Sequence, residues 1–414
     1  MGTKFFDELE IRPPGEREAD LVARLPAQIA MAKKEASGWS KHLAGIDPAQ
    51  ITSREALAKL PVLRKADLMA AQSEEPPLGG FAAGDFSTYK RIFMSPGPIW
   101  EPQGPEADPW KSARSFHAVG IRPGDIVHNA LSYHMTPGGF ILDQGARAYG
   151  CVVFPAGIGN TDLQVSAISS LRPRAYAGTP DYLKVILDRA DELGADVSSI
   201  TRGLVSGGAL YPSLREEYAK RGVKVLQSYA TADLGIVAYE SEAMEGLIAN
   251  EDFIIEIVRP GTGEPVAEGE VGELVVTSFS PTYPLIRFAT GDLSAVLPGT
   301  SPCGRTNMRL KGWMGRADQR TKVKGMFVDP AQIDRLRKQA GDDVRRARLS
   351  VVRKGEQDHM ILKVETEAAS DDFIAALKTY LKEHTGLSGE VELVAPDSLP
   401  NDGKVISDER ELSV

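Results

Sequence analysis

Three polar side chains in the carboxyl-terminal third of the chain have types that suit chemistry on a nucleotide. Asp292 ends the block Pro-Leu-Ile-Arg-Phe-Ala-Thr-Gly-Asp, Arg316 lies in Gly-Arg-Ala-Asp, and Lys404 ends Leu-Pro-Asn-Asp-Gly-Lys. When a carboxylate is joined to the α-phosphate of ATP, an acid must hold the ribose diol and a lysine must neutralise the charge that builds on the attacked phosphate. We predict that Asp292 and Lys404 supply these groups, and that Arg316 lies on a mobile segment.

Taken singly, each of these residues also has an ordinary structural explanation. An aspartate in a Thr-Gly-Asp turn is more often only a turn former. Lysines are common in surface turns such as the one around Lys404, and the basic residues between 316 and 325 also suit a solvated face. A functional interpretation therefore depends on the order in which these blocks occur together.

The segments that must position these side chains alternate between helix and strand patterns. Leu21, Leu25 and Ile29 are spaced to form one apolar face of a helix over residues 16–45. Between residues 110 and 240, apolar strand-like runs alternate with helical patterns, which is typical of a parallel sheet with helices on its faces. The Pro-rich and Gly-rich stretch at 76–109 between them is too long for a routine connector and predicts an irregular segment.

Length and pattern together predict an α/β protein of two domains. With 414 residues, the chain exceeds what one hydrophobic core usually organises. We predict a large domain at 1–318, built of parallel-rich sheets flanked by helices and of a β region after residue 250. A small mobile α+β lid domain at 319–414 is expected to follow the basic stretch.

Further sequence blocks occur in a definite order with those that contain Asp292 and Arg316. Gly-Glu-Leu-Val at 272–275 precedes the Asp292 block, Cys-Gly-Arg-Thr follows at 303–306, and Lys324-Gly325 comes after Gly-Arg-Ala-Asp. Together with Leu-Ala-Lys-Leu-Pro-Val-Leu-Arg-Lys-Ala-Asp-Leu at 57–68, they make the chain resemble the phenylacetate-CoA ligase branch of the AMP-forming acyl-CoA synthetases over nearly its whole length. The resemblance implies an enzyme that activates a carboxylic acid with ATP as an acyl-adenylate and transfers the acyl group to CoA.

The resemblance assigns nucleotide-binding roles to two further segments. The backbone of Ser-Gly-Gly-Ala-Leu-Tyr-Pro at 206–212 would lie along the adenine, which implicates Gly208, Ala209 and Leu210. A strand-to-helix turn that needs small residues is the ordinary alternative. In Ser-Tyr-Ala-Thr-Ala-Asp, Tyr229 would stack on adenine and Asp233 would hold Mg²⁺. Because aspartate is one methylene shorter than the family's glutamate, the ion would have to lie closer to the backbone or bind through water.

The same resemblance implies that residues near the carboxyl end take part in a rotation of the small domain. Arg316 and the residues near Asp318 and Gln319 match the swivel about which the family's small domain turns between an adenylating and a thioester-forming pose. Lys324 and Gly325 would be presented to the site in the second pose. Lys404 matches the end of the family's Pro-x-x-x-Gly-Lys pattern, which makes it the predicted catalytic lysine.

One loop departs from the family pattern. Where relatives have Ser-Ser-Gly-Thr-Thr-Gly-Lys-Pro, a flexible loop that cradles pyrophosphate, residues 95–102 are Ser-Pro-Gly-Pro-Ile-Trp-Glu-Pro. The two additional prolines each remove a backbone donor, Ile99 replaces a hydroxyl, and Glu101 puts a negative charge where a lysine stood. We infer weak ATP binding, a rearranged phosphate contact, or loss of the first half-reaction.

The segment Ala-Leu-Ser-Tyr-His-Met-Thr-Pro-Gly-Gly-Phe at 130–140 resembles the one that lines the acid's site in the family. Its Tyr133, His134 and Phe140 suggest an aromatic or otherwise flat apolar acid. Core packing is the ordinary explanation for any one of them.

The overall composition argues against several classes of partner. A formal net charge of −9 argues against nucleic acid as a partner. The two cysteines are too few for a disulfide framework, which favours a reducing compartment, and Cys303 lacks the second cysteine that a structural zinc would need. No apolar run is long enough to cross a bilayer, so we expect a cytoplasmic protein without a membrane partner. A homodimer is compatible with the sequence.

The sequence therefore predicts an AMP-forming carboxylate–CoA ligase that uses ATP, CoA and a small carboxylic acid. Two alternatives stay open because of the altered loop. The first is an enzyme that transfers AMP or a preactivated acyl group without CoA. The second is a binding protein, a relative that holds acyl-CoA or a nucleotide without turnover.

Overall fold

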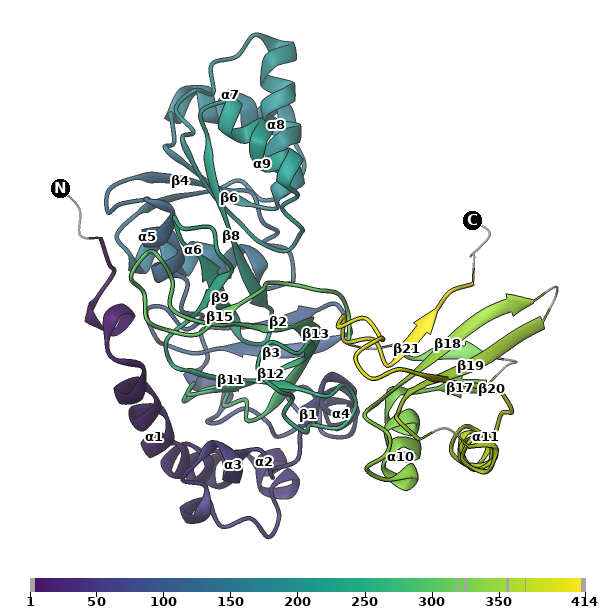
Figure 1. Cartoon of the computed structure of the whole chain (residues 1–414). Helices are drawn as coiled ribbons and strands as arrows, with labels where there is room; N and C mark the ends of the chain where they lie inside the picture. Colours follow the sequence, from purple (N-terminus) through teal and green to yellow (C-terminus); the bar gives the residue numbers. More distant parts are fainter. Residues whose placement is uncertain (1–3, 318, 324–325, 355–356, 369, 411–414) are drawn as a thin grey trace. The chain divides into compact units, whose positions relative to one another are not determined.

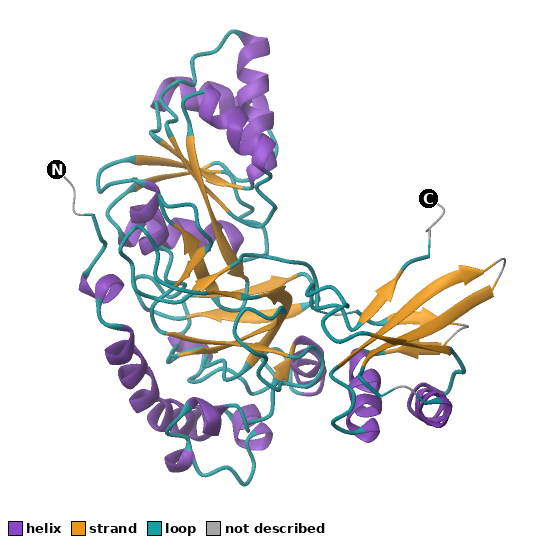
Figure 2. Cartoon of the chain, in the orientation of Figure 1, coloured by secondary structure: helices purple, strands orange, loops and turns teal. Residues whose placement is uncertain are grey.

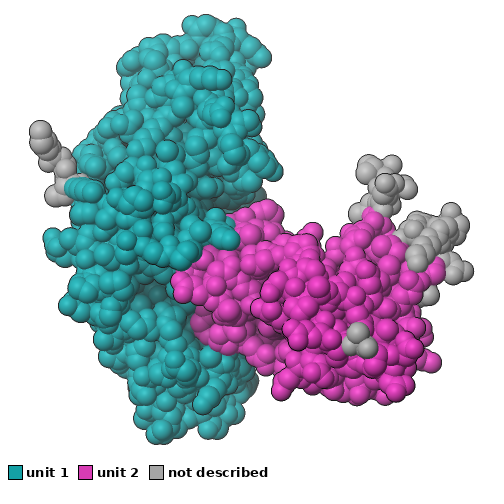
Figure 3. Space-filling view, in the orientation of Figure 1, with its two compact units in different colours: residues 1–255, 276–290, 297–312 teal, residues 256–275, 291–296, 313–414 magenta. Residues whose placement is uncertain are grey.

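The computed structural model of the chain describes residues 4–317, 319–323, 326–354, 357–368 and 370–410. It divides into two compact units, which Figure 3 colours separately. The first unit comprises residues 1–255, 276–290 and 297–312, and the second comprises residues 256–275, 291–296 and 313–414. Both units combine helices with sheets (Figure 2), so the predicted α/β class is confirmed. The domain boundary between residues 318 and 319 stays a prediction.

Helices dominate the amino end of the first unit: η1 (Glu8–Ile11), α1 (Pro14–Glu35), α2 (Ser37–His42), η2 (Pro48–Gln50), α3 (Arg54–Leu57) and, after the short strand β1 (Leu63–Arg64), α4 (Lys65–Glu74). Leu21, Leu25 and Ile29 are buried along α1, as their spacing predicts. The single helix predicted over 16–45 is wrong at Ala36, whose extended backbone (φ −134°, ψ 109°) separates α1 from α2. None of the helices in the described ranges is both long and apolar enough to cross a membrane.

A large sheet forms the centre of the first unit. Its parallel part contains β4 (Ile126–Asn129), β5 (Val152–Pro155), β6 (Ala175–Gly178), β7 (Arg202–Val205) and β8 (Lys224–Thr231), in the order β8-β7-β6-β4-β5. The antiparallel strands β9 (Gly235–Glu240), β10 (Leu247–Ala249) and β15 (Arg309–Leu310) continue the sheet beyond β8. The parallel sheet predicted between residues 110 and 240 is confirmed.

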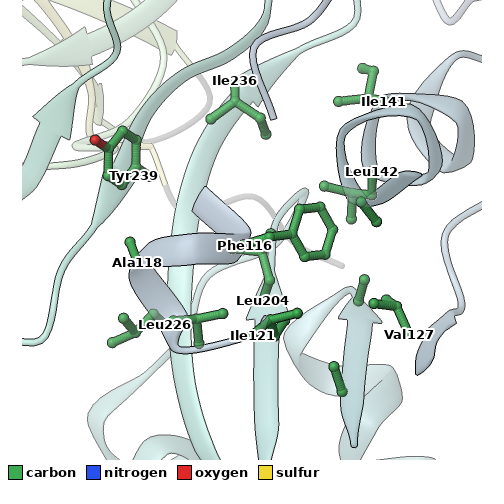
Figure 4. Close-up of a cluster of buried hydrophobic side chains, with 14 of the residues drawn as sticks. Phe116, Ala118, Ile121, Val127, Ile141, Leu142, Leu204, Leu226, Ile236 and Tyr239 are labelled. Atoms are coloured by element: carbon green, nitrogen blue, oxygen red, sulfur yellow. The ribbon is translucent and has the colours of Figure 1, made fainter. Parts of the chain in front are cut away.

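Helices cover both faces of this sheet (Figure 1). On one face lie α5 (Ala113–Val119) and α6 (Gly138–Ala148), and on the other lie α7 (Thr161–Leu171), α8 (Pro180–Leu193) and α9 (Pro212–Lys220). Successive strand residues point to opposite faces, so Leu204 joins the core beneath α5 and α6 shown in Figure 4, and Val205 joins the other core. Burial on both faces explains why the strands consist of nearly continuous apolar runs.

The stretch at 76–109 is more ordered than predicted. It contains the short helix η3 (Phe86–Thr88) and a hairpin of β2 (Arg91–Ser95) and β3 (Ile99–Gln103), in which Ser95 pairs with Ile99. Pro96 and Pro98 lie in the turn, where the ladder needs no backbone donor from them. The side-chain amide of Gln72 in α4 bonds both backbone groups of Trp100, at 2.8 and 2.9 Å, and so fixes the hairpin to the helix.

The second unit ends in the predicted α+β segment. Its elements are β16 (Thr321–Val323), β17 (Met326–Val328), α10 (Pro330–Ala340), β18 (Arg346–Lys354), β19 (Gln357–Glu365), α11 (Asp371–Thr385), β20 (Glu390–Val394) and β21 (Ile406–Asp408). The sheet order is β20-β19-β18-β21, and its apolar face packs on α10 and α11 around Leu336, Leu349 and Leu377. Strands β11 (Phe253–Val258), β12 (Gly272–Ser278), β13 (Phe288–Ser294) and β14 (Val296–Leu297) run from one unit into the other.

A glycine permits the close packing of α6. A Cβ added at Gly145 would lie 2.1 Å from Ser112 Cβ and 2.9 Å from Ser112 backbone atoms. We predict that Gly145→Ala lowers the free energy of unfolding of the first unit by about 2 kcal/mol, because the helix must move away from its neighbour. Gly15→Ala in α1 is the matched control, since nothing lies within 4 Å of its added Cβ. Calorimetric unfolding of both variants checks this, and equal Tm values would contradict it.

Candidate active site

The predicted adenine-binding residues lie at the carboxyl ends of two neighbouring parallel strands. Gly208, Ala209 and Leu210 follow β7, and Tyr229 lies on β8, which pairs with β7. Ser206 Oγ donates a hydrogen bond to Ser228 O at 3.0 Å, which holds the segment after β7 against β8. Ligands of open α/β sheets bind outside the carboxyl ends of the strands, so this edge suits a nucleotide base.

The backbone at Gly208 approaches α8 closely. A Cβ there would meet Pro180 Cδ at 3.2 Å, so the small residue is needed for packing as well as for access. Gly208 and Ala209 are exposed, whereas Leu210 is buried in the core. Exposed backbone at the first two positions is available to a ligand, and the Leu210 side chain fixes the segment to the sheet.

Two of the three residues predicted to bind the acid belong to one aromatic cluster. The rings of Tyr133 and Phe140 meet edge to face with centroids 5.0 Å apart, and Phe93 of β2 lies 5.2 Å from Phe140. Tyr133 Oη donates to Asp143 Oδ2 at 3.0 Å and accepts from Asn129 Nδ2 at 2.7 Å. Burial, followed by the charge of Asp143, raises the pKa of Tyr133, so its hydroxyl stays protonated.

His134, the third predicted residue, differs from these two because its side chain is exposed. Its backbone N–H donates to Ser132 Oγ at 3.2 Å. The turn thus leaves His134 and Met135 exposed, and the ring contacts among Tyr133, Phe140 and Phe93 do not include the histidine.

The altered loop places a carboxylate inside the first unit. Glu101 on β3 is only 2 % exposed, and its Oε1 accepts a hydrogen bond from Ser95 Oγ at 2.5 Å. Asp233, in the turn between β8 and β9, has a fully buried side chain whose Oδ2 lies 3.0 Å from Lys65 Nζ. Burial, and then the charge of Asp233, raise the pKa of Glu101 to about 8, whereas Ser95 and Lys65 act in the opposite direction.

Asp233 does not offer a good magnesium site. Mg²⁺ requires six oxygen ligands at about 2.0–2.1 Å and retains several waters. Asp233 provides one buried carboxylate that is already paired with Lys65, and the described residues contain no group of three His, Cys, Asp or Glu side chains that could hold a metal ion. These residues do not fit a protein-held magnesium ion, and we derive no chemical step from one.

In the second unit, the Thr-Gly-Asp corner has a defined geometry. Asp292 Oδ1 accepts hydrogen bonds from Arg316 Nη1 at 2.7 Å and from Trp313 Nε1 at 3.1 Å. Gly291 has φ +75°, and a Cβ there would lie 2.6 Å from Arg316 Nη2. The glycine is thus required both by the turn and by the approach of the guanidinium. Sequence patterns placed Asp292 and Arg316 in separate roles and did not reveal Trp313.

The turn that carries Lys404 is held by hydrogen bonds within the second unit. Gln319 Nε2 donates to Gly403 O at 2.8 Å, and its Oε1 accepts from Val405 N and Ile406 N at 2.6 and 2.9 Å. Arg348 Nε donates to Lys404 O at 2.9 Å and its guanidinium pairs with Asp402. The Lys404 side chain itself is exposed. Lys324 and Gly325, together with Asp318, lie outside the described residues.

Comparisons with known proteins identify relatives of the whole chain. A family model described as "AMP-binding enzyme" matches residues 112–281. The chain is 30% identical over 426 residues to a phenylacetate-coenzyme A ligase from Escherichia coli strain K12, covering 96% of each chain. It is 30% identical over 378 residues to one from Pseudomonas putida, covering 86% of this chain and 84% of that relative.

The chain belongs to the phenylacetate-coenzyme A ligase family of adenylate-forming enzymes. The fold also resembles an open conformation of 2-hydroxyisobutyryl-CoA ligase in complex with 2-HIB-AMP and CoA, with a TM-score of 0.74 and 25% identity over 96% of this chain and 92% of that one. A second structure of that ligase, in the postadenylation state with 2-HIB-AMP, gives a TM-score of 0.73 at 26% identity over 99% and 93%. Family membership confirms the resemblance inferred from the ordered blocks. The individual residue roles stay predictions.

Two residues that organise the site were missed as functional candidates. Lys65 lies within the Leu-Arg-Lys-Ala-Asp-Leu block that carried part of the resemblance, but nothing local indicates its contact with Asp233, which is distant in the sequence. Gln319 was predicted only as part of a hinge, although it binds the backbone of the Lys404 turn. Spacing alone reveals neither contact, because both depend on tertiary packing.

The raised pKa of Glu101 predicts a pH-dependent stability. The folded state retains a proton that the unfolded state loses between its ordinary pKa of 4.5 and about 8, so stability falls as pH rises through this window. Glu101→Gln removes this titration, and we expect the variant to gain stability over the parent by on the order of 3 kcal/mol at pH 8.5 and by little at pH 5. Calorimetric Tm values at both pH values measure the difference.

Exposed Glu74 provides the control for this comparison. Glu74→Gln should follow the parent at every pH, since the Glu74 side chain is exposed to solvent before and after unfolding. Parallel pH profiles for the parent and Glu101→Gln would show that Glu101 is ionised in the folded protein and would contradict the burial argument.

Proposed function

We propose that this chain is an AMP-forming acyl-CoA ligase that activates an aromatic carboxylic acid as its acyl-adenylate and then transfers the acyl group to CoA. The proposal rests above all on Asp292, whose carboxylate is oriented by Arg316 and Trp313 in a chain similar to CoA ligases over almost its full length. An acid held in this way can accept hydrogen bonds from two vicinal hydroxyls, which is the requirement for binding ribose.

In the first half-reaction, a carboxylate oxygen of the acid would attack the α-phosphorus of ATP, and the bond to pyrophosphate would break. Negative charge grows on the α-phosphate oxygens as the new bond forms. Lys404 is the residue proposed to neutralise that charge, because it is an exposed ammonium at the end of a turn whose backbone is fixed by Gln319 and Arg348. Tyr229 and the backbone at 208–210 would bind the adenine.

In the second half-reaction, the thiolate of CoA would attack the acyl carbon, and AMP would leave with the electrons of the broken anhydride bond. The proposal gives Lys324 and Gly325 a role in this step, through rotation of the small domain about the segment around Arg316 and Gln319. Gln319 would then couple the hinge to the catalytic turn, because it already binds the backbone on both sides of Lys404.

The aromatic cluster supports an aromatic acid. Tyr133, Phe140 and Phe93 present ring faces and edges, and the Tyr133 hydroxyl is committed to Asp143 and Asn129. A flat apolar substrate would bury its surface against these rings without leaving a polar group unpaired. The guanidinium of Arg91, 4.6 Å from the centre of the Phe140 ring, is a nearby positive charge for a carboxylate.

One observation favours the second candidate, an enzyme that moves AMP or an acyl group already activated. Glu101 occupies the position of the family's loop lysine and lies beside Asp233, so a buried carboxyl group replaces a cation near the expected phosphate site. Even a solvated charge pair contributes about 1 kcal/mol; this attraction is absent while Glu101 is protonated and becomes repulsion above its pKa. A nucleotide without β- and γ-phosphates does not depend on that attraction.

Removal of the Lys404 ammonium tests the proposed chemistry. We expect Lys404→Met to lower the rate of pyrophosphate release with a panel of aryl acids by about 100-fold or more, because charge on the attacked phosphate is then unbalanced. Thioester formation from a supplied acyl-adenylate should be affected much less. Lys378→Met, an exposed lysine on α11 in the same unit, is the matched control and should leave both rates unchanged.

Two results would decide against the ligase. If the parent releases no pyrophosphate with any acid but converts supplied acyl-adenylate, the transferase candidate replaces it. If neither reaction occurs while AMP still binds, the chain is a binding relative.

A further inference from the structure

A cavity of about 60 Å³ in the first unit is lined by several acidic and aromatic side chains. We call it the acidic cavity, and its lining includes Glu101, Glu106, Asp233, Asp252, Trp110 and Tyr283. These residues come from strand β3, the segment after it, the turns around Asp233 and Asp252, and the loop between β12 and β13. The cavity has room for a few water molecules or for one short polar group.

Two of the four acids already have a cationic partner. Asp233 pairs with Lys65 at 3.0 Å, and Asp252 pairs with Arg24 at 2.7 Å and with Lys111 at 3.2 Å. Glu101 and Glu106 form no ion pair with any residue in the described ranges. Their position differs from that of surface acids, because Glu101 is 2 % exposed and belongs to a fixed hairpin.

Five buried oxygen atoms around the acidic cavity make no hydrogen bond to described residues: Glu101 Oε2, Glu106 Oε2, Tyr283 Oη and both carboxylate oxygens of Asp233, although Asp233 Oδ2 lies 3.0 Å from Lys65 Nζ. Tyr283 is 5 % exposed, and the charges of Asp233 and Glu101 reach its hydroxyl. Buried polar groups without partners are costly and point to a missing partner. Three of the atoms are carboxylate oxygens of Glu106 and Asp233, which only accept, so a partner that donates hydrogen bonds and carries positive charge suits the cavity.

We propose that the acidic cavity binds the primary ammonium group of a small organic molecule. An ammonium has three N–H donors for these acceptors, and its charge offsets the Glu106 carboxylate, which forms no ion pair with the described residues. The indole of Trp110 and the ring of Tyr283 add aromatic surface that suits a cation and its alkyl stem. A metal ion is a poorer match, since no three acids of the described chain are placed to share one.

A series of tilted and edge-to-face ring contacts runs from Trp110 in the lining of the acidic cavity to the residues proposed to bind the acid. Trp110 lies 5.9 Å from Phe93, Phe93 lies 5.2 Å from Phe140, and Phe140 lies 5.0 Å from Tyr133, measured between centroids. The ammonium therefore belongs either to a free amine or to an amino acid whose carboxylate reaches the acid site. Binding of the ammonium does not depend on turnover, so this inference stands apart from the proposed ligase activity.

Titration of the intact protein with ethylammonium, at constant ionic strength, tests the proposal. We expect saturable heat in calorimetry and a rise in Tm with ethylammonium, and no response to ethanol of similar shape. Glu106→Gln should weaken the binding roughly tenfold, as expected for the loss of one charged hydrogen bond, and Glu74→Gln should not. Tyr283→Phe, which removes one acceptor and keeps the ring, is a second variant in case Glu106→Gln does not fold.

Further titrations distinguish a free amine from the amine of an acid substrate, and specific ammonium binding from other causes of a response. ω-Amino acids of increasing length should show an optimum if the amine belongs to the acid substrate, and should bind no better than ethylammonium if the amine is free. An equal response to ethanol, a response to MgCl₂ alone, or no saturable response to ethylammonium would each overturn the proposal. The last result would mean that the acidic cavity holds only water.

Discussion

A buried carboxylate must be given a positive partner or a proton, and this requirement shapes the first unit around Asp233. The Lys65 ammonium is the positive partner of Asp233, whereas Glu101 beside it accepts a hydrogen bond from the Ser95 hydroxyl and forms no ion pair with the described residues. The hairpin that carries Glu101 is fixed to α4 through Gln72, and Lys65 begins the same helix. Helix α4 thus carries both Gln72, which fixes the altered loop, and Lys65, whose ammonium balances the charge of Asp233.

The rest of the first unit provides a rigid frame for this cluster. Two hydrophobic cores fix the parallel strands from both sides, and the strand ends place Tyr229 and the segment proposed to bind the base at one edge. The rings proposed to bind the acid lie on β2, in the segment after β4 and on α6, so the same sheet and hairpin position them. In the second unit, the Asp292 corner and the Lys404 turn are fixed by hydrogen bonds from Arg316 and Gln319.

Periodic features were predictable because they follow from local pattern. The alternation of apolar strands and helices between 110 and 240 predicted the parallel sheet, since strands buried on both faces require it. The ordered blocks predicted the family, which the relatives confirm. The break at Ala36 and the hairpin at 91–103 were missed, because a helix interruption and a proline-flanked turn are decided by what the segment packs against.

Contacts between residues that are distant in the sequence could not be predicted either. The pairs Lys65–Asp233 and Arg316–Asp292 join residues that single-sequence patterns consider separately. The change from lysine to Glu101 was visible in the sequence, and so was its sign. Its consequence was not, because a carboxylate at the surface would merely repel phosphate, whereas burial raises the pKa of Glu101.

The central claim is that the phosphate end of this site has a buried carboxyl group, Glu101, in place of the family's lysine, so nucleotide affinity comes from the adenosine and the α-phosphate. Calorimetric dissociation constants for AMP and ATP, measured at pH 7.5 on the same preparation, test it most directly. The account predicts that AMP binds as tightly as ATP or more tightly. ATP binding tenfold tighter than AMP would show that the β- and γ-phosphates are held after all and would contradict it.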